Sequence, residues 1–514
     1  MTRWLLTPMQ PTPNGRLHLG HGAGPYLRAD VIARMLRSQG HDAEIITGSD
    51  AYENWVLADS LTSGRTAHQT CDHFHTGIAE DLAYMGVELA EWINPLAPEH
   101  RDAYIRTQED LLRDVTGRGV AVLTDEQVPI GERSGTALVG VWIAGNCPSC
   151  GKAAGGNSCT FCSDSFHPSQ LLDPHSRLSD EPIRWEVRKN WLAPAQSPHA
   201  VLQGLAGAGV SSQAMEPVHK WLGREDPSIR LSLPGTWGVH SDLAPDGAVL
   251  SNTYYGYTLY CGDRHAARHD GANPFSPESG VRTIGLFGTD NSIAGMAAPW
   301  VLTEGSKAYR PFDRTVVNSM LHWAGRKLST SQNYGLWIGD LAEGSDITSD
   351  ELRFVLSSIP LDQEVSSVDA HMIADTVNSL RKWRNGSLRE ALEKCASSSA
   401  RLGHTQELER ALEIQHRWLS PPTFDLALAH RELQYWMSVP AGVRPPDWLV
   451  GVSLLAWPIM PVLSQQVWTA LGLHGAPMVS ALDAQPRLQV DSRRFDPQPH
   501  GVVTPGQIDK LARQ

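Results

Sequence analysis

Short apolar runs and amphipathic segments alternate over the first part of the chain. Trp4–Met9 is an apolar run, Asp42–Thr47 is the next strand-like segment, and each ends in a turn rich in glycine, proline or polar residues. Apolar residues at helical spacing fill the intervals: the segment from His18, then Asp30–Ser38, Thr66–Met85 and Glu99–Gly117. Strands that alternate with helices are typical of a parallel sheet covered on both faces. Residues 1–117 therefore predict an α/β fold with a doubly wound parallel sheet.

The alternation stops at residues 118–235. Strand-like segments occur at Val120–Thr124 and Ala137–Ile143, and four cysteines follow them. Strand character returns over residues 236–345, where Gly247–Gly262 is rich in tyrosine, Arg282–Phe287 is an apolar strand, and Val316–Trp323 is a strand or strand-like edge. We therefore expect residues 118–235 to be an insertion between two halves of one α/β domain, 1–117 and 236–345.

Helical spacing dominates the rest of the chain. A helix start at Ser349 is marked by early acidic residues, and four longer amphipathic segments follow: His371–Cys395, Thr405–Leu419, Phe424–Ser438 and Trp448–Leu471. This pattern predicts a helix bundle over 346–480. The segment 481–514 contains several prolines and little periodicity, so we expect a tail that packs along the surface or is mobile.

Composition limits the classes of protein that need consideration. The 514 residues are 41% hydrophobic and 19% charged, as in ordinary globular proteins. No run of apolar residues is long enough to span a membrane, and no signal peptide precedes Trp4, so we expect a cytoplasmic protein without membrane contact. The formal net charge of -13 argues against a protein that coats nucleic acid. The basic group Arg381, Lys382 and Arg384 could contact RNA, but a solvated helix face is the expected reading.

Four of the seven cysteines form two Cys-x-x-Cys pairs: Cys147 with Cys150, and Cys159 with Cys162. Two such pairs can supply four thiolates at the tetrahedral geometry that Zn²⁺ prefers. Four cysteines leave no open coordination position, so we expect a structural zinc. The nearby His167 is expected at the surface rather than on the metal.

Polar residues stand where apolar strands end. His18 and His21 follow the turn Asn14-Gly15 at a strand-to-helix junction, which is where phosphate binds in doubly wound folds. Gly20 leaves the backbone bare for a flat ring. Asp50 and Asp290 each follow a strand, and the loop Arg326 to Ser331 combines cations with hydroxyls that suit a polyphosphate.

Taken in order, these segments resemble the class I aminoacyl-tRNA synthetases, specifically the methionyl-tRNA synthetase family. The chain carries that family's Asn-Gly-x-x-His-x-Gly-His signature at 14–21, and its cysteine knuckle is similar at 147–162. Gly288-Thr289-Asp290 resembles the ribose-binding motif, and Lys327–Ser331 lies where the family carries Lys-Met-Ser-Lys-Ser. The resemblance implies a Rossmann-like catalytic domain, a connective insertion with a zinc knuckle, and an anticodon-binding-like bundle.

The resemblance also implies activation of an amino acid by Mg²⁺·ATP to aminoacyl-AMP, followed by acyl transfer to tRNA, in a monomer. The implied roles fall into three groups. Catalytic roles go to His18, His21, Lys327, Ser329 and Ser331. ATP contacts go to Asn14, Gly15, Gly20, Gly288, Asp290, Lys327 and Thr330. Amino-acid contacts go to Met9, Asp50, Leu250, Tyr254, Asn291, Ala294 and Gly295, with Asp50 on the α-ammonium.

The sequence departs from the family in three places. Thr330 replaces the second lysine of the phosphate loop. Met9, Leu250, Asn291, Ala294 and Gly295 replace much of the apolar and aromatic wall of the amino-acid pocket, so methionine is not the expected substrate. The anticodon side, Trp436–Trp448, is shortened and rich in proline. Two further readings therefore stay open: a ligase that transfers the acyl group to a small-molecule amine, and a silent binding paralogue.

Overall fold

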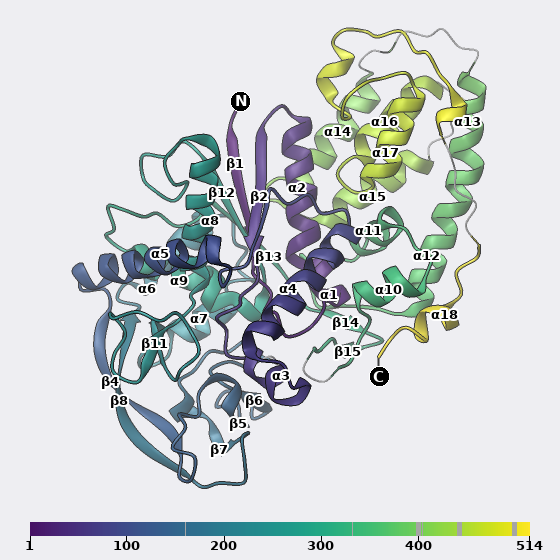
Figure 1. Ribbon diagram of the computed structural model, residues 1–514. Helices are drawn as coiled ribbons and strands as arrows, with labels where there is room; N and C mark the ends of the chain where they lie inside the picture. Colours follow the sequence, from purple (N-terminus) through teal and green to yellow (C-terminus); the bar gives the residue numbers. More distant parts are fainter. Residues whose placement is uncertain are drawn as a thin grey trace.

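The computed structural model describes residues 1–159, 161–330, 333–396, 402, 405–438, 445–495 and 501–513. Its centre is a five-stranded sheet of order β13-β12-β1-β2-β3, in which every neighbouring pair is parallel (Figure 1). The strands are β1 (Arg3–Pro8), β2 (Asp42–Gly48), β3 (Glu91–Ile93), β12 (Arg282–Gly288) and β13 (Arg314–Asn318). The predicted doubly wound α/β fold is confirmed.

Two hydrophobic cores cover the two faces of this sheet. Leu5 and Leu6 are consecutive and fully buried, and they belong to different cores because alternate strand residues face opposite sides. Helices α2 (Leu27–Ser38) and α4 (Ala67–Tyr84) share the core of Leu6. Helices α5 (Pro98–Gly117), α8 (Tyr254–His269) and α9 (Ala298–Thr303) share that of Leu5. The strands are thus fixed from both sides, and their carboxyl ends stay open for function.

The insertion between the two halves contains two small antiparallel sheets. The first joins β4 (Val122–Gly131), β8 (Ile183–Pro194) and β9 (Ser228–Arg230). The second joins β5 (Ile143–Asn146), β6 (Ala153–Gly155) and β7 (Leu172–Ser176). Helices α6 (Pro198–Gly207) and α7 (Glu216–Leu222), with the hairpin of β10 (Ser232–Pro234) and β11 (Ala248–Leu250), lead back to the central sheet.

The predicted strand Ala137–Ile143 is wrong for most of its length. Gly140–Trp142 forms a short 3-10 helix, and β5 starts only at Ile143. The Asn54 side chain replaces the strand partner here, because its amide donates to Val139 O at 3.0 Å and its carbonyl accepts from Val141 N at 3.1 Å. Sequence pattern could not anticipate a partner so distant in the chain.

Two segments of the second half also differ from the prediction. The tyrosine-rich segment is not strand-like: from Tyr254 it forms α8, whose Thr253 cap accepts from Gly256 N at 3.0 Å. Val316–Trp323 is not one strand, since β13 ends at Asn318 and β14 (Leu321–Trp323) starts a separate sheet with β15 (Arg326–Lys327) and β16 (Ser366–Val368). The break occurs where Ser319 N bonds to Leu361 O rather than to a strand.

Helices fill the rest of the described chain. The helices that follow the α/β region are α10 (Ile338–Gly344), α11 (Ser349–Ser357), α12 (Ala370–Trp383), α13 (Arg389–Cys395), α14 (Gln406–Trp418), α15 (Leu426–Ser438), α16 (Pro445–Ala456) and α17 (Pro461–Ala470). The predicted helix His371–Cys395 contains a π-helical turn at Arg384–Leu388, and Trp448–Leu471 is two helices because Pro458 has no N–H to continue the first. None of the described helices is both long and apolar enough to cross a membrane.

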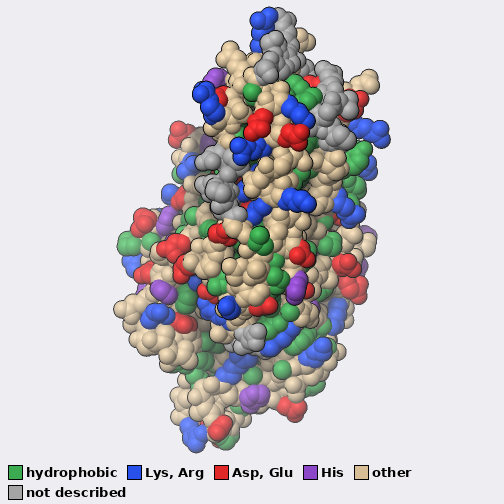
Figure 2. Space-filling view, turned by 90° about the vertical axis from the view of Figure 1, so that its right-hand side faces the viewer, with side chains coloured by type: hydrophobic (Ala, Val, Ile, Leu, Met, Phe, Trp, Pro, Cys, Tyr) green, Lys and Arg blue, Asp and Glu red, His purple; other side chains and the backbone are tan. Residues whose placement is uncertain are grey.

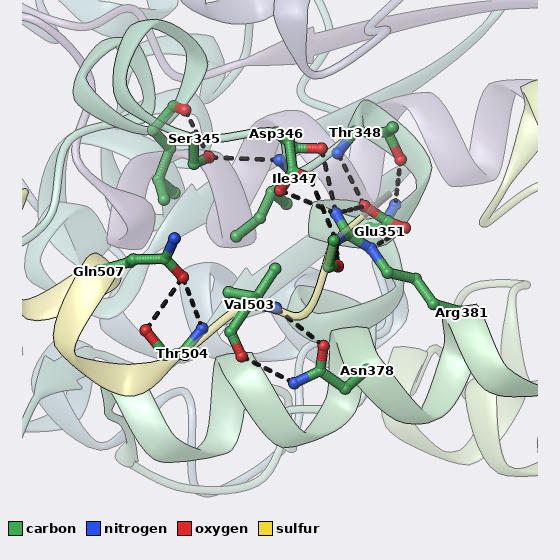
Figure 3. Close-up of polar contacts among 12 residues, drawn as sticks. Ser345, Asp346, Ile347, Thr348, Glu351, Asn378, Arg381, Val503, Thr504 and Gln507 are labelled. Carbon is green, nitrogen blue, oxygen red and sulfur yellow. Dashed lines mark hydrogen bonds and ion pairs between the residues drawn. The ribbon is translucent and has the colours of Figure 1, made fainter. Parts of the chain in front are cut away.

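The tail packs along the surface where it is described. Helix α18 (Pro505–Asp509) lies beside α12, and the Asn378 side chain bonds to both Val503 O (2.8 Å) and Val503 N (3.0 Å), as Figure 3 shows. Arg513 pairs with Asp340 of α10 at 3.0 Å. The tail therefore links α12 to α10.

The expectation of a solvated basic face on α12 is wrong for Arg381. Its guanidinium is buried, and it pairs with Glu351 of α11 (2.9 Å) and with Asp346 (3.1 Å), as the close-up shows (Figure 3). Lys382, by contrast, is exposed. On the face drawn in Figure 2, blue and red side chains are interspersed among the described residues. Arg381 therefore stabilises the helical region internally.

Candidate active site

A cavity of about 570 Å³ opens at the carboxyl edge of the parallel sheet. Residues from the α/β segments before and after the insertion, and from the insertion itself, line it together. The predicted site residues that line it are Met9, His18, Gly20, His21, Asp50, Leu250, Tyr254, Gly288, Asp290, Asn291, Ala294 and Lys327. Groups from distant parts of the sequence thus converge where parallel sheets bind ligands.

His18 caps the short helix α1 (Leu19–His21), and His21 is its last residue. Their rings stack with centroids 3.7 Å apart and 10° between the planes. Burial lowers the pKa of His21 to about 4, and burial with the neighbouring charge of His21 holds the pKa of His18 well below its usual value. Both rings are therefore neutral at pH 7, and each offers one N–H donor. A Cβ added at Gly20 would lie 3.1 Å from both the His18 ring and Leu328, a tight contact that these side chains would have to relieve by small shifts.

Asp50 follows β2 and faces the cavity. The Asn252 amide donates to its carboxylate, and the Tyr104 hydroxyl donates to Asn252 in turn. Burial, and then the charge of Glu53, raises the pKa of Asp50 well above its usual value. Glu53 lines the same cavity, and burial raises its pKa as well. Sequence reasoning missed Glu53, although an acidic residue three positions after a strand-end aspartate was a visible signal.

Asp290 follows β12 and is exposed toward the cavity opening. The Asn291 amide donates to its carboxylate at 3.2 Å. A Cβ at Gly288 would lie 2.7 Å from the same carboxylate, so glycine allows Asp290 to fold back over the strand end. Asn318 at the end of β13 also lines the cavity, and its Oδ1 is buried without a partner among the described residues. The pair Asp290 and Asn318 offers polar groups at adjacent strand ends.

Lys327 extends the cavity wall from β15. Burial lowers its pKa, and the charge of Asp290 opposes that shift. Ser329 is held by two backbone bonds to Tyr334, each of 3.0 Å. Thr330 lies against the turn after β1, together with Asn14 and Gly15 beside a smaller cavity of about 150 Å³. Ser331 lies outside the described residues.

Only some of the residues predicted to contact the amino acid line the cavity. The Tyr254 hydroxyl is tied to Thr7 O at 2.7 Å, which turns its ring toward the cavity beside Met9 and Leu250. Gly295 does not line the cavity: a Cβ there would meet the Phe287 ring at 2.6 Å, so Gly295 allows a close packing contact. Gln10 was not predicted; it lines the cavity, and its Nε2 is buried without a partner among the described residues.

The four predicted cysteines form one cluster beside this cavity. Their sulfur atoms lie within 4.8 Å of one another, with Cys147 3.7 Å from Cys162 and Cys150 3.7 Å from Cys159. Four sulfurs at 2.3 Å from a tetrahedral Zn²⁺ would be about 3.8 Å apart. The donor set and spacing therefore fit a structural metal site.

His167 is apart from this cluster, as predicted, but it is not at the surface. It is half-buried in the cavity wall, where its Nδ1 lies 3.2 Å from Glu126. Glu126 also accepts from Arg230 at 2.8 Å and from Asn190 at 2.8 Å. This network holds parts of the insertion together beside the cavity, a role that sequence spacing alone did not reveal.

Comparisons with known proteins add to this geometry. The family model described as tRNA synthetases class I (M) matches residues 4–382. A methionine--tRNA ligase of Chlorobaculum tepidum is 25% identical over 92% of this chain and 74% of the relative. A methionine--tRNA ligase of Porphyromonas gingivalis is 25% identical over 69% of this chain. The match spans 52% of the length of that relative. The Mycobacterium tuberculosis methionyl-tRNA synthetase in complex with methionyl-adenylate has a similar fold, with a TM-score of 0.70 and 15% sequence identity. The match covers 98% of this chain and 100% of that chain.

Proposed function

This chain belongs to the class I tRNA synthetase (M) family, and from that premise we propose that it activates an α-amino acid with ATP. A carboxylate oxygen of the amino acid attacks the α-phosphorus, and the bond from that phosphorus to the bridging oxygen of the β-phosphate breaks. Aminoacyl-AMP forms and pyrophosphate leaves. A hydroxyl of tRNA then attacks the acyl carbonyl, and AMP leaves.

One observation carries the proposal. His18 and His21 from the first half and Lys327 from the second half line one cavity at the sheet edge. Neutral imidazoles donate to the phosphate oxygens, and Lys327 supplies a positive charge where charge develops on the leaving pyrophosphate. Asp290 and Asn318 lie where the ribose would bind, and Mg²⁺ would accompany the triphosphate. No covalent intermediate on the protein is needed, because positioning and electrostatic stabilisation suffice.

The amino-acid specificity that we propose is not that of a methionine enzyme. Asp50, oriented by Asn252, would bind the α-ammonium. Glu53 adds a second carboxylate to the same cavity, and Gln10 adds a buried donor. Buried polar groups without partners are costly unless a ligand satisfies them. Glu53 accepts hydrogen bonds and Gln10 Nε2 donates one, whereas a thioether offers only a weak acceptor, so a substrate side chain that carries a donor or a cation for Glu53 and a stronger acceptor for Gln10 fits better.

A second candidate function differs only in the acceptor. The two tryptophans that flank the shortened anticodon-side segment are buried, and each indole donates to the other's backbone carbonyl: Trp436 to Trp448 at 3.0 Å and Trp448 to Trp436 at 2.8 Å. Neither ring is exposed for stacking on a base. This observation favours transfer of the acyl group to a small-molecule amine rather than to tRNA.

The test is amino-acid-dependent exchange of pyrophosphate into ATP over a broad panel, followed by acyl transfer with and without total tRNA. Exchange with a polar or cationic amino acid supports the proposal, and no exchange with any amino acid contradicts it. Acylation of tRNA supports the first acceptor. Exchange without tRNA acylation, together with amide formation from added amines, supports the second.

A further inference from the structure

A cluster of three potential metal ligands lies away from the catalytic edge, between α8 and the sheet. His265 and His269 are four residues apart on α8, so both rings lie on one face of the helix. Glu44 belongs to the neighbouring strand β2, opposite Leu5 in the register. One ligand atom from each of the three lies within 4.8 Å of the others. Two histidines and a carboxylate at this spacing are a common ligand set for Zn²⁺.

The nitrogen atoms of this cluster lack ordinary partners. His265 is 2% exposed, and its Nδ1 is buried without a hydrogen-bond partner among the described residues. Nε2 of His269 also makes no hydrogen bond of acceptable geometry there, although it lies 3.3 Å from Glu44 Oε1. The ring centroids of the two histidines are 4.5 Å apart. Buried polar atoms without partners are rare in native structures, and a bound ion is one accepted explanation.

The protonation states suit a metal. Burial, and then the charge of His269, lowers the pKa of His265 to about 4, so the imidazole is neutral at pH 7. Neutral imidazole is the form that binds a transition metal. The pKa of Glu44 is lowered despite its burial, because Arg268 donates a hydrogen bond to it, so its carboxylate is ionised. His265 and Glu44 are thus in their ligand forms without any change.

We propose that His265, His269 and Glu44 bind a second divalent transition-metal ion of the Zn²⁺ class, distinct from the metal of the four cysteines. Water would complete the coordination, because the three residues leave one tetrahedral position open. The site would cross-link the end of α8 to β2. The other end of α8 carries Tyr254 and Tyr257, which line the catalytic cavity, so the metal would stabilise that wall.

The charges around the cluster are mixed and permit a cation. Arg268 donates to Glu44 through two nitrogens, each 3.3 Å from a carboxylate oxygen. Arg3 lies close enough to lower the pKa of His265, whereas Asp42 raises it. With a metal on one carboxylate oxygen, Arg268 can keep the other, an arrangement that orients metal-binding carboxylates elsewhere. The half-buried Glu44 and His269 leave a path for the ion.

The test counts zinc bound to the whole protein after dialysis against micromolar Zn²⁺. We expect two equivalents for the unchanged protein and one for His265→Asn and for Glu44→Gln, with Cys150→Ala also retaining one. His199→Gln, which changes an exposed histidine of α6, is the matched control and should retain two. Folding of each variant is checked by circular dichroism, and Glu44→Gln, which keeps side-chain volume, covers the case in which His265→Asn does not fold.

Cobalt then separates the two sites. Co²⁺ bound to cysteines gives a thiolate charge-transfer band in the near ultraviolet, and Co²⁺ bound to His, His and Glu gives only visible bands. We expect Cys150→Ala to weaken the first and His265→Asn to remove the second. A single equivalent in the unchanged protein, or two equivalents in both His265→Asn and Glu44→Gln, would overturn the proposal.

Discussion

Gly15 and Thr330 are in contact across the two halves of the catalytic domain: a Cβ added at Gly15 would collide with the Thr330 methyl group. Gly15 belongs to the turn after β1, and Thr330 to the loop after β15. The loop that carries Lys327 and Thr330 therefore packs against the turn at Asn14 and Gly15. Lys327 lies in the cavity wall. The place of the second cation that the resemblance leads one to expect is thus held by a methyl group and a hydroxyl.

Thr330→Lys should raise the rate of amino-acid-dependent pyrophosphate exchange. A positioned donor to developing charge is worth on the order of 10²-fold in rate, and a loop lysine with more freedom should supply about tenfold. Thr330→Gln is the matched control, because it adds length without charge, and it should leave the rate within about twofold. Equal rates for Thr330→Lys and the unchanged protein would show that another group already supplies the missing charge.

The paired histidines should make stability depend on pH in a defined direction. The folded-state pKa of His21 is about 4, below the value of an unfolded histidine, so the unfolded state binds more protons. Stability from this group is present above about pH 6.5 and is lost as pH falls toward 4. His21→Asn should therefore flatten the loss of stability between pH 7 and pH 5, measured by urea unfolding at each pH. A parallel pH profile for the variant and the unchanged protein would contradict this assignment.

Asp50 and Glu53 should have separable effects. Asp50→Asn should reduce kcat/KM for every amino acid by about 10²-fold or more, because it removes the charge that would pair with the α-ammonium. Glu53→Gln keeps side-chain volume, so it should reduce kcat/KM chiefly for the preferred substrate and bring methionine closer to it. Pyrophosphate exchange with the full panel measures both. A uniform loss in Glu53→Gln across the panel would assign Glu53 to structure rather than to selectivity.

Loss of the cysteine-bound metal should affect both stability and activity. Residues beside the knuckle, including Ser163 and Phe166, line the catalytic cavity, so its collapse would open one wall. We expect Cys150→Ala to lower Tm and to raise KM for the amino acid. Lys152→Gln, a change beside the cluster that leaves the four thiols intact, is the control. An unchanged Tm on removal of this metal would show that the knuckle folds without it.

The features that the sequence predicted are those fixed by neighbouring residues, and the features that it missed are fixed by contacts between residues distant along the chain. The strand ends that carry His18, Asp50 and Asp290 were visible, because local periodicity fixes where a strand stops. Gly140–Trp142 and α8 were misread, because Asn54 and the packed tyrosines act through contacts distant in sequence. The lining role of Gln10 and Glu53, and the position of Gly295 behind Phe287, likewise depend on three-dimensional packing that no spacing rule contains.

Arg381 provides the last prediction, which concerns the helical region. Its guanidinium pairs with the buried carboxylate of Glu351 and also with Asp346. Arg381→Gln should destabilise the protein by about 3 kcal/mol, because the buried carboxylate of Glu351 keeps, among the described residues, only the more distant Arg384, 3.7 Å away, as its cationic partner. Lys382→Gln, at the adjacent exposed position, should change the free energy of unfolding by less than about 0.5 kcal/mol. Urea unfolding measures both. If Arg381 bound RNA instead, Arg381→Gln would leave the free energy of unfolding unchanged and would weaken tRNA binding. The two variants therefore distinguish a structural role of Arg381 from a role in RNA binding.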